Sequence, residues 1–250
     1  MKNAEFFSPC RKAKLSFGFT LAEVLITLGI IGIVAAITIP SLVQKYKVMV
    51  LRNQFKVADA FLQEALQKSV TELGYINANE FMPQQNVSSE GIIDFQNTVE
   101  QLNEIWLKQF KIIKKFSVNE LLYKKDYICH AVSDNSKLSF TNCPMIEFGD
   151  VFLLSNGILV TRMYEMHSAH GYLRIAYTFD TNGLKGPNRH GYDIFSYRSI
   201  EHIKMCNSTL PGNYSSLGCY YFASKNINPV YDDKDYWDIL YKPKSYFEKK

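Results

Sequence analysis

The sequence predicts an α+β protein in which one long N-terminal helix packs on a head with an antiparallel sheet of about four strands. Three observations indicate this class: an unbroken apolar run near the N-terminus, a helical apolar periodicity that continues from it, and short strand-like segments in the second half. Hydrophobic residues make up 47% of the 250 and charged residues 21%, the balance of a globular protein. The formal charge of +4 is small, so no specific nucleic-acid partner is predicted.

The apolar run extends from Phe19 to Ile39, and Glu23 is its only charged residue. As a helix of about 1.5 Å per residue it spans about 31 Å, which is the thickness of a bilayer core. Arg11, Lys12 and Lys14 precede it, and positive charge beside a membrane span stays on the cytoplasmic side. The sequence therefore predicts a single membrane pass with the N-terminus in the cytoplasm and the head outside.

A secretory signal peptide has the same order of charged and apolar residues, and Val34-Ala35-Ala36 offers a small-residue cleavage site. Two features favour a permanent segment instead. A carboxylate inside the apolar run is costly in hydrocarbon unless a cation meets it, and a disposable signal has no reason to carry one. The apolar periodicity also continues beyond the run.

Helical periodicity extends past Pro40 to about Leu73, where Gly74 is a natural stop. The apolar positions recur mostly every three, four or seven residues: Val43, Tyr46, Val50, Phe55, Phe61, Leu62, Ala65, Leu66 and Leu73. This pattern predicts a second, amphipathic half of the same helix. Pro40 lacks a backbone N–H, so a kink or a looser turn is expected there.

Residues 14–25 combine a basic leader, a Gly18–Phe19 junction, one carboxylate at Glu23 and the start of the apolar helix. This pattern resembles the prepilin N-terminus shared by type IV pilins and the pseudopilins of type II secretion systems. The resemblance implies that the leader is cut after Gly18 and that the new N-terminal Phe19 is methylated. It also implies that Glu23 helps the subunit dock during assembly. Pro40 stands where many members carry a helix-kinking proline.

The helix patterns and this resemblance together divide the chain into four parts. These are a cleaved leader (1–18), a transmembrane and assembly half of the helix (19–39), an amphipathic half (40–74) and a globular head (75–250). The resemblance implies self-assembly with pilin or pseudopilin subunits, and contacts with a prepilin peptidase, an inner-membrane assembly platform and membrane lipid. It places the protein in a bacterial inner membrane and then in an extracytoplasmic filament.

The head shows a helical pattern followed by strand patterns. Apolar positions between Asn97 and Phe116 predict a second helix. The pattern from Glu147 to Met163 then predicts a β-hairpin with its turn at Ser155-Asn156-Gly157. Two further strands are predicted, at Tyr172–Phe179 and Asp193–Tyr197.

Four cysteines follow the leader and form two local pairs, Cys129 with Cys143 and Cys206 with Cys219. Short spacings of this kind suit loop-closing disulfides in an oxidising compartment. Free buried thiols and a four-cysteine zinc site are the alternatives, although the close C-x2-C pairs of zinc sites are absent.

The segment from Asp180 to Asp193 is rich in glycine, proline, Asn and Asp, which predicts a tight, ordered loop. Asp180, Asn182 and Asp193 could offer oxygen ligands to calcium, and major pseudopilins bind calcium in a loop near their C-terminus. The spacing lacks the acidic residue that closes an EF-hand, and Lys185 and Arg189 disfavour a cation. A loop held by its own turns, without any cofactor, is the preferred interpretation, and calcium stays open.

No catalytic motif is present, so an enzyme is not predicted. His167, His170 and His190 are interpreted as isolated surface histidines and not as a metal triad. The predicted function is a structural subunit of a type IV pilus or a secretion pseudopilus. The alternative is a minor pilin whose head binds a ligand in adhesion or DNA uptake, and a membrane-anchored enzyme comes third.

Overall fold

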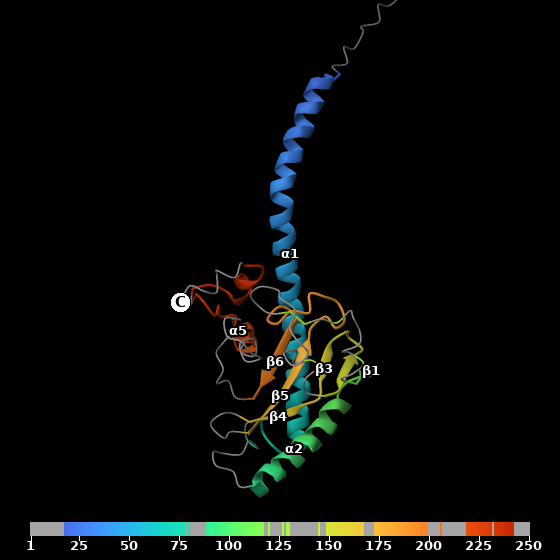
Figure 1. Ribbon diagram of the computed structural model, residues 1–250, viewed down its shortest axis with the longest axis vertical. Helices are drawn as coiled ribbons and strands as arrows, with labels where there is room; N and C mark the ends of the chain where they lie inside the picture. The colour runs from blue at the N-terminus through green and yellow to red at the C-terminus, as the bar shows by residue number, and fades with distance from the viewer. Residues whose placement is uncertain are drawn as a thin grey trace, which may run out of the picture. The chain divides into compact units, whose positions relative to one another are not determined.

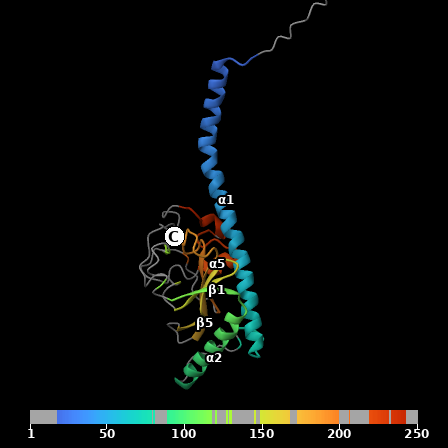
Figure 2. The same ribbon diagram turned by 90° about the vertical axis from the view of Figure 1, so that its right-hand side faces the viewer.

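The computed structural model describes residues 18–78, 80, 89–117, 120, 127, 129–130, 145, 149–167, 173–199, 206, 219–231 and 233–242. The chain divides into two compact units, an N-terminal unit that ends at Lys45 and a head, Tyr46–Lys250. Helix α1, Leu21–Glu72, contributes to both. In the head the second half of α1 lies beside an antiparallel sheet, so the predicted α+β class is confirmed (Figures 1 and 2).

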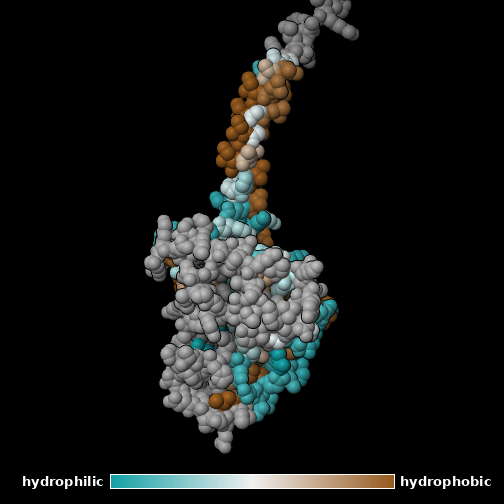
Figure 3. Space-filling model, viewed as in Figure 1, coloured by the Kyte–Doolittle hydropathy of each residue, from teal (hydrophilic) through white to brown (hydrophobic). Residues whose placement is uncertain are grey.

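The N-terminal half of α1 exposes its apolar side chains (Figure 3). Leu25, Ile26, Leu28, Ile31 and Ile33 are each more than half exposed. Pro40 lies inside this helix. An apolar surface of this extent is unfavourable in water, so lipid or other apolar helices must cover it.

Helix α1 ends just before Gly74, the glycine at which the sequence predicts its end. Gly74 has a left-handed backbone, with φ of +90°. Its N–H donates to the carbonyl of Thr71 (2.9 Å), and the N–H of Tyr75 donates to that of Val70 (3.1 Å). This pair of bonds is the Schellman motif, which satisfies carbonyls that a helix end would otherwise leave without partners.

One face of the second half of α1 enters the core of the head. Its buried apolar residues recur every three or four positions, as an amphipathic helix requires: Leu51, Phe55, Ala58, Leu62, Ala65, Leu66 and Val70. The ring of Phe55 lies 4.5 Å from that of Phe195 and 5.6 Å from that of Trp237, measured between centroids. Helix α2, Ser89–Lys108, adds Leu102 and Trp106 to the same core.

Among the described residues the sheet has six strands, and the pairings between these strands are antiparallel. The strands are β1 (Ile112–Phe116), β2 (Val151–Leu154), β3 (Leu159–Thr161), β4 (Tyr164–His167), β5 (Leu173–Asp180) and β6 (Ile194–Arg198). Strand β5 pairs with β6 along one edge and with both β3 and β4 along the other. Asn103 of α2 supports the bend between β3 and β4, because its Oδ1 accepts the N–H of Met163 (3.1 Å).

Two strands were not predicted. Residues 112–116 form β1, and the second helix ends at Lys108, so the predicted helix from Asn97 to Phe116 is wrong over its last part. Ile112 and Ile113 are partly or largely exposed, and β-branched residues at a sheet edge favour the strand. Strand β4 is only four residues long and carries Glu165. Its alternation of apolar and polar residues is therefore too short to predict a strand from the sequence.

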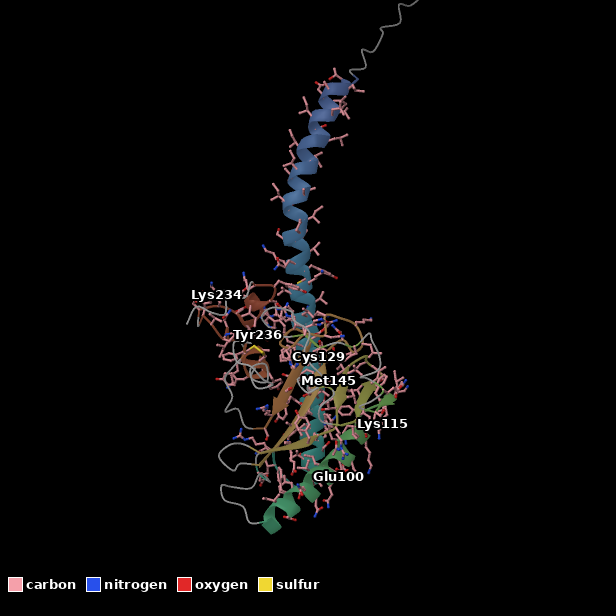
Figure 4. The ribbon with its side chains drawn as sticks, in the orientation of Figure 1. Glu100, Lys115, Cys129, Met145, Lys234 and Tyr236 are labelled. Carbon is pink, nitrogen blue, oxygen red and sulfur yellow. A yellow bond between two sulfur atoms is a disulfide. The ribbon has the colours of Figure 1, made fainter. Side chains whose placement is uncertain are left out.

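A second, smaller core lies on the far side of the sheet. It contains Phe116, Tyr127, Cys129, Met145, Val151, Leu159 and Ile194. Figure 4 shows Cys129 and Met145 together in this region. Two short C-terminal elements, helix α5 (Cys219–Lys225) and the 3-10 helix η2 (Tyr236–Ile239), also belong to the head.

Candidate functional site

The first turn of α1 is closed by Thr20 and Glu23. The backbone N–H of Thr20 donates to Glu23 Oε2 (2.8 Å), and the N–H of Glu23 donates to Thr20 Oγ1 (3.2 Å). The Thr20 hydroxyl also donates to the same carboxylate oxygen (2.9 Å). This reciprocal arrangement is a capping box, and it satisfies two N–H groups that a helix start leaves without partners.

The junction between Gly18 and Phe19 lies outside the helix. Both residues are exposed, Phe19 at 88%, and neither has helical structure. A peptide bond must leave a helix before a protease can act on it, so this junction has a cleavable geometry. The cap places the Glu23 carboxylate within one turn of the backbone nitrogen that cleavage would free.

A match to a family model over residues 14–39 decides what this segment is. The chain carries the prokaryotic N-terminal methylation motif. This methylation motif is the prepilin-type N-terminus of type IV pilins and pseudopilins, so the resemblance read from residues 14–25 is confirmed. Neither a search of curated proteins nor a search of solved structures found a match to this chain.

The methylation motif indicates a structural protein and implies assembly with other pilin subunits and processing by a prepilin peptidase. Helix α1 is long and apolar enough to cross a membrane, by length and composition. Together, the motif and the exposed apolar helix fit an inner-membrane anchor. The motif covers residues 14–39 only and does not extend into the head.

Asp180 lies at the end of β5, fully buried, at the start of the predicted loop. Its Oδ1 accepts the N–H groups of Asn182 and Gly183, each at 3.0 Å, which is an Asx turn. Its Oδ2 accepts the hydroxyl of Tyr127 (2.9 Å). Gly183 is required here, because it has φ of +73° and a Cβ would lie 2.3 Å from the carbonyl oxygen of Gly157.

Asp193 closes the other end of the loop and is also fully buried. Its Oδ1 accepts the N–H of Arg189 (2.6 Å), and its Oδ2 accepts the N–H of Asn188 (2.8 Å). The side-chain amide of Asn182 donates to Oδ2 as well (3.3 Å). The loop is therefore ordered by carboxylates that bind its own N–H groups.

Burial raises the pKa of both carboxyl groups, that of Asp193 to about 7 and that of Asp180 well above its ordinary value. For Asp180 the neighbouring Asp193 charge acts in the same direction. Each carboxyl group accepts two backbone N–H groups, so the third partner distinguishes them. The third partner of Asp193 is the amide nitrogen of Asn182, which can only donate, whereas that of Asp180 is the Tyr127 hydroxyl, which can reverse its hydrogen bond and accept one from the protonated acid. We therefore assign the proton to Asp180 first.

The described residues contain no group of three or more His, Cys, Asp or Glu arranged to hold a metal. Asp180, Asn182 and Asp193 do come together, as ligands of one site would, but through hydrogen bonds with one another and with the loop. His190 is buried, and burial lowers its pKa to about 4, so its interpretation as a surface histidine is wrong. The side chains of His167 and His170 lie outside the described part.

Cys206 and Cys219 form a disulfide. It lies against the end of the Asp180–Asp193 loop, since a Cβ on Gly191 would be 3.1 Å from Cys219 Sγ. The hydroxyl of Tyr236 donates to the carbonyl of Gly191 (2.7 Å) at the same place. Cys129 is also disulfide-bonded. Its predicted partner Cys143 lies outside the described residues, so that pairing stays a prediction.

A polar network between α1, β5 and α5 was not predicted. The Tyr220 hydroxyl donates to Asp59 Oδ1 (2.6 Å), and Gln63 Nε2 donates to the hydroxyls of Tyr177 and Tyr220, both at 3.1 Å. Burial raises the pKa of Asp59. In the sequence, Asp59 and Gln63 lie one helical turn apart beside the apolar face of this helix. Two polar residues in that position could have indicated a buried polar network.

Proposed function

We propose that the protein is a structural subunit of a type IV pilus or of a type II secretion pseudopilus. A prepilin peptidase cuts it between Gly18 and Phe19, Phe19 is methylated, and the subunit polymerises through its N-terminal helix. The methylation motif at residues 14–39, continuous with an exposed apolar helix, carries this proposal. No catalytic role is proposed.

The chain divides by role into a leader (1–18), a transmembrane and assembly half of α1 (19–39), an amphipathic half (40–74) and a head (75–250). Before assembly, lipid covers the exposed apolar side chains, with the leader in the cytoplasm and the head outside. After assembly, the same half of α1 from other subunits covers them. An inner-membrane platform is the partner that moves the subunit between these two states.

Glu23 supplies the charge on which docking depends. Cleavage frees a cationic amine at Phe19, which is unstable in a low dielectric without a counter-charge. The Glu23 carboxylate can meet this amine in its own subunit or that of a neighbour, which offsets the burial of both. In the precursor Thr20 holds this carboxylate at the helix start. Pro40 gives α1 a point where it can bend.

In the head, two disulfides and the Asp180–Asp193 loop serve stability. We propose that Cys129 pairs with Cys143 and that calcium contributes little to the loop. The donors around Asp180 and Asp193 support this view, because each carboxylate oxygen already accepts at least one hydrogen bond. The alternative function, a minor pilin whose head binds a ligand, is favoured by one observation, two hollows of about 530 and 440 Å³ that are lined in part by residues 46–58 of α1.

The N-terminal mass of the mature protein tests the proposal. The full chain is produced in cells with and without a prepilin peptidase, and the N-terminal peptide is analysed by mass spectrometry. With the peptidase, the chain is expected to begin at Phe19 with one added methyl group, and without it residues 1–18 are retained. A chain that begins at Ile37 instead would indicate ordinary secretion and would overturn the filament function.

A further inference from the structure

The second half of α1 has a face opposite the core of the head, and this face is apolar along its first part and polar along its second. Its residues recur every three or four positions, and the first part carries Tyr46, Met49, Val50, Asn53, Val57 and Phe61. We call these residues without Asn53 the outer stripe. Beyond Phe61 the same face continues with Glu64 and Lys68, which form an ion pair, and with Thr71.

The outer stripe is exposed. Val57 is 69% exposed, Tyr46 61%, Met49 53% and Phe61 36%. Lys56 lies at the margin of the stripe, where its long stem lets the ammonium group reach water. A row of large apolar side chains about 24 Å long is unfavourable in water. The stripe therefore indicates a partner that supplies an apolar surface.

A lipid bilayer that α1 crosses can cover only the first half of the helix. Residues 19–39 already span about 31 Å, which is the thickness of a bilayer core. Phe61 lies about 33 Å further along the helix than Ile39. The partner of the stripe is therefore a protein surface, and the chain itself contains one that is apolar and exposed, the first half of α1.

This first half carries two glycines that the fold of the subunit does not require. Gly29 and Gly32 lie inside the helix, where glycine is less favourable than alanine. A Cβ at either position would meet nothing within 4 Å. Ala36 follows on the same face, four residues after Gly32. Small residues at this spacing let a second helix approach closely, so this face can receive bulky side chains from outside the subunit.

We propose that the outer stripe of one subunit packs against the first half of α1 in a second copy of this chain. Its bulky side chains fill the face that carries Gly29, Gly32 and Ala36. Residues 24–44 contain no charged side chain, so one helix can cover the 16 residues from Tyr46 to Phe61 without burying a charge. The inference rests on the proposed filament function and assigns the helix surface that the head contributes to it.

Charge limits the register of the two helices. All copies cross the membrane in the same direction, so the helices are parallel. Glu23 of the second copy must not pass Lys45 of the first, or its carboxylate would lie on the stripe, and Lys45 of the second copy must stay beyond Phe61. The offset is therefore about 17 to 22 residues, or about 25 to 33 Å. Val57 of one copy then lies beside residues 35–40 of the other.

Cysteine cross-linking in sheared filaments tests this contact. The full chain carries Val57→Cys together with either Ala36→Cys or Ile39→Cys, and the filaments are treated with a short bismaleimide. Within one subunit Val57 and Ala36 are about 32 Å apart along the helix, so a short linker can join them only between copies. At least one of the two pairs is expected to give a ladder of multimers on a denaturing gel.

The controls use the polar part of the same face. Lys68→Cys combined with Ala36→Cys should give no ladder, because Lys68 lies beyond the stripe. The single variants should not give one either, because a ladder needs two linked positions in each copy. Wild-type filaments report any linkage through the native cysteines.

A second variant tests whether the contact supports assembly. Val57→Asn should lower the filament yield about tenfold, because an amide would be buried against an apolar helix. The unfolding temperature of the detergent-solubilised chain should change little, since Val57 is exposed. Ile76→Asn is the matched control: Ile76 is 76% exposed and lies beyond the end of α1, so this variant should assemble like the wild type.

The outcomes separate this proposal from the filament function. Filaments of a subunit that begins at Phe19 but gives no ladder from either pair would overturn the stripe contact and leave the filament function intact. A wild-type filament yield from Val57→Asn would overturn the contact as well. A wild-type chain that begins elsewhere and forms no filaments would overturn both.

Discussion

Thr20 and Glu23 satisfy each other's polar groups across the first turn of α1: the N–H of each residue donates to the side-chain oxygen of the other. Glu23 therefore has a structural role in the precursor besides its proposed role in assembly. A substitution that removes the whole carboxylate would remove both. The two roles can be separated by a side chain that keeps the acceptor and loses the charge.

Glu23→Gln is that substitution. The amide oxygen can still accept the Thr20 N–H, so the helix start should be retained, and loss of a charge should leave membrane insertion intact or improve it. Assembly should fall strongly, because the Phe19 amine would lose its counter-charge. The measurement is the amount of subunit in sheared filaments relative to the amount in the membrane fraction. Glu23→Ala and Thr20→Val are measured for comparison. Normal filament yield from Glu23→Gln would show that docking does not depend on this charge.

Gly18→Val should block processing without disturbing the fold. A Cβ at Gly18 meets nothing within 4 Å, so the side chain fits in open space, and any effect arises at the peptidase. The expected result is an uncut chain with its leader and without N-methylation, observed as a larger mass. Gly29→Ala, where a Cβ also meets nothing within 4 Å, is the matched control and should be cut normally. Efficient cutting of Gly18→Val would mean that the junction lies elsewhere.

Patterns that depend on a few neighbouring residues could be predicted from the sequence. The prepilin-type motif and the helix end at Gly74 are local signals, and so is the loop after Asp180. Strand β1 was missed because Ile112 and Ile113 fit a helix as well as a strand until β2 pairs with them. The burial of His190 and the hollows along α1 depend on segments that are distant in sequence, so no local pattern predicts them.

The buried pair Asp180 and Asp193 should make the head less stable as the pH rises from about 4 to above 7. The folded-state pKa values are raised, so the unfolded chain loses protons near pH 4 that the folded chain keeps. Their stabilisation is complete below pH 4 and is lost as the pH passes the folded pKa of Asp193, about 7. Buried neutral His190 acts in the opposite direction below pH 6.5, so the two effects must be separated by mutation.

Asp180→Asn makes this separation. It keeps an oxygen for the Asx turn, and its amide can donate to the Tyr127 oxygen, while one titrating group is removed. Denaturant unfolding of the variant should show a smaller fall in stability between pH 5 and 8 than the wild type shows. Asp94→Asn, on the exposed side of α2, should follow the wild type. Parallel curves for wild type and Asp180→Asn would contradict the assignment of the proton.

The disulfides should pair locally. The Cys206–Cys219 bridge closes a loop of about 14 residues, so its loss through Cys219→Ser should cost about 3 kcal/mol of the free energy of unfolding. Non-reducing peptide mapping should recover this pair and Cys129 linked to Cys143. A peptide that joins Cys129 to Cys206 or Cys219, or four free thiols, would refute the pairing.

Calcium removal should have little effect on the Asp180–Asp193 loop. Each carboxylate oxygen already accepts an N–H or O–H group, so an added cation would have to replace those donors. If calcium were integral, its removal would leave two buried carboxylates repelling each other, and linkage to a tight ligand would lower the melting temperature by several degrees. Thermal melts of residues 46–250, with calcium and with chelator at one neutral pH, measure this directly. No shift is expected, whereas a clear fall in chelator that Asp180→Ala abolishes would make the loop a calcium site.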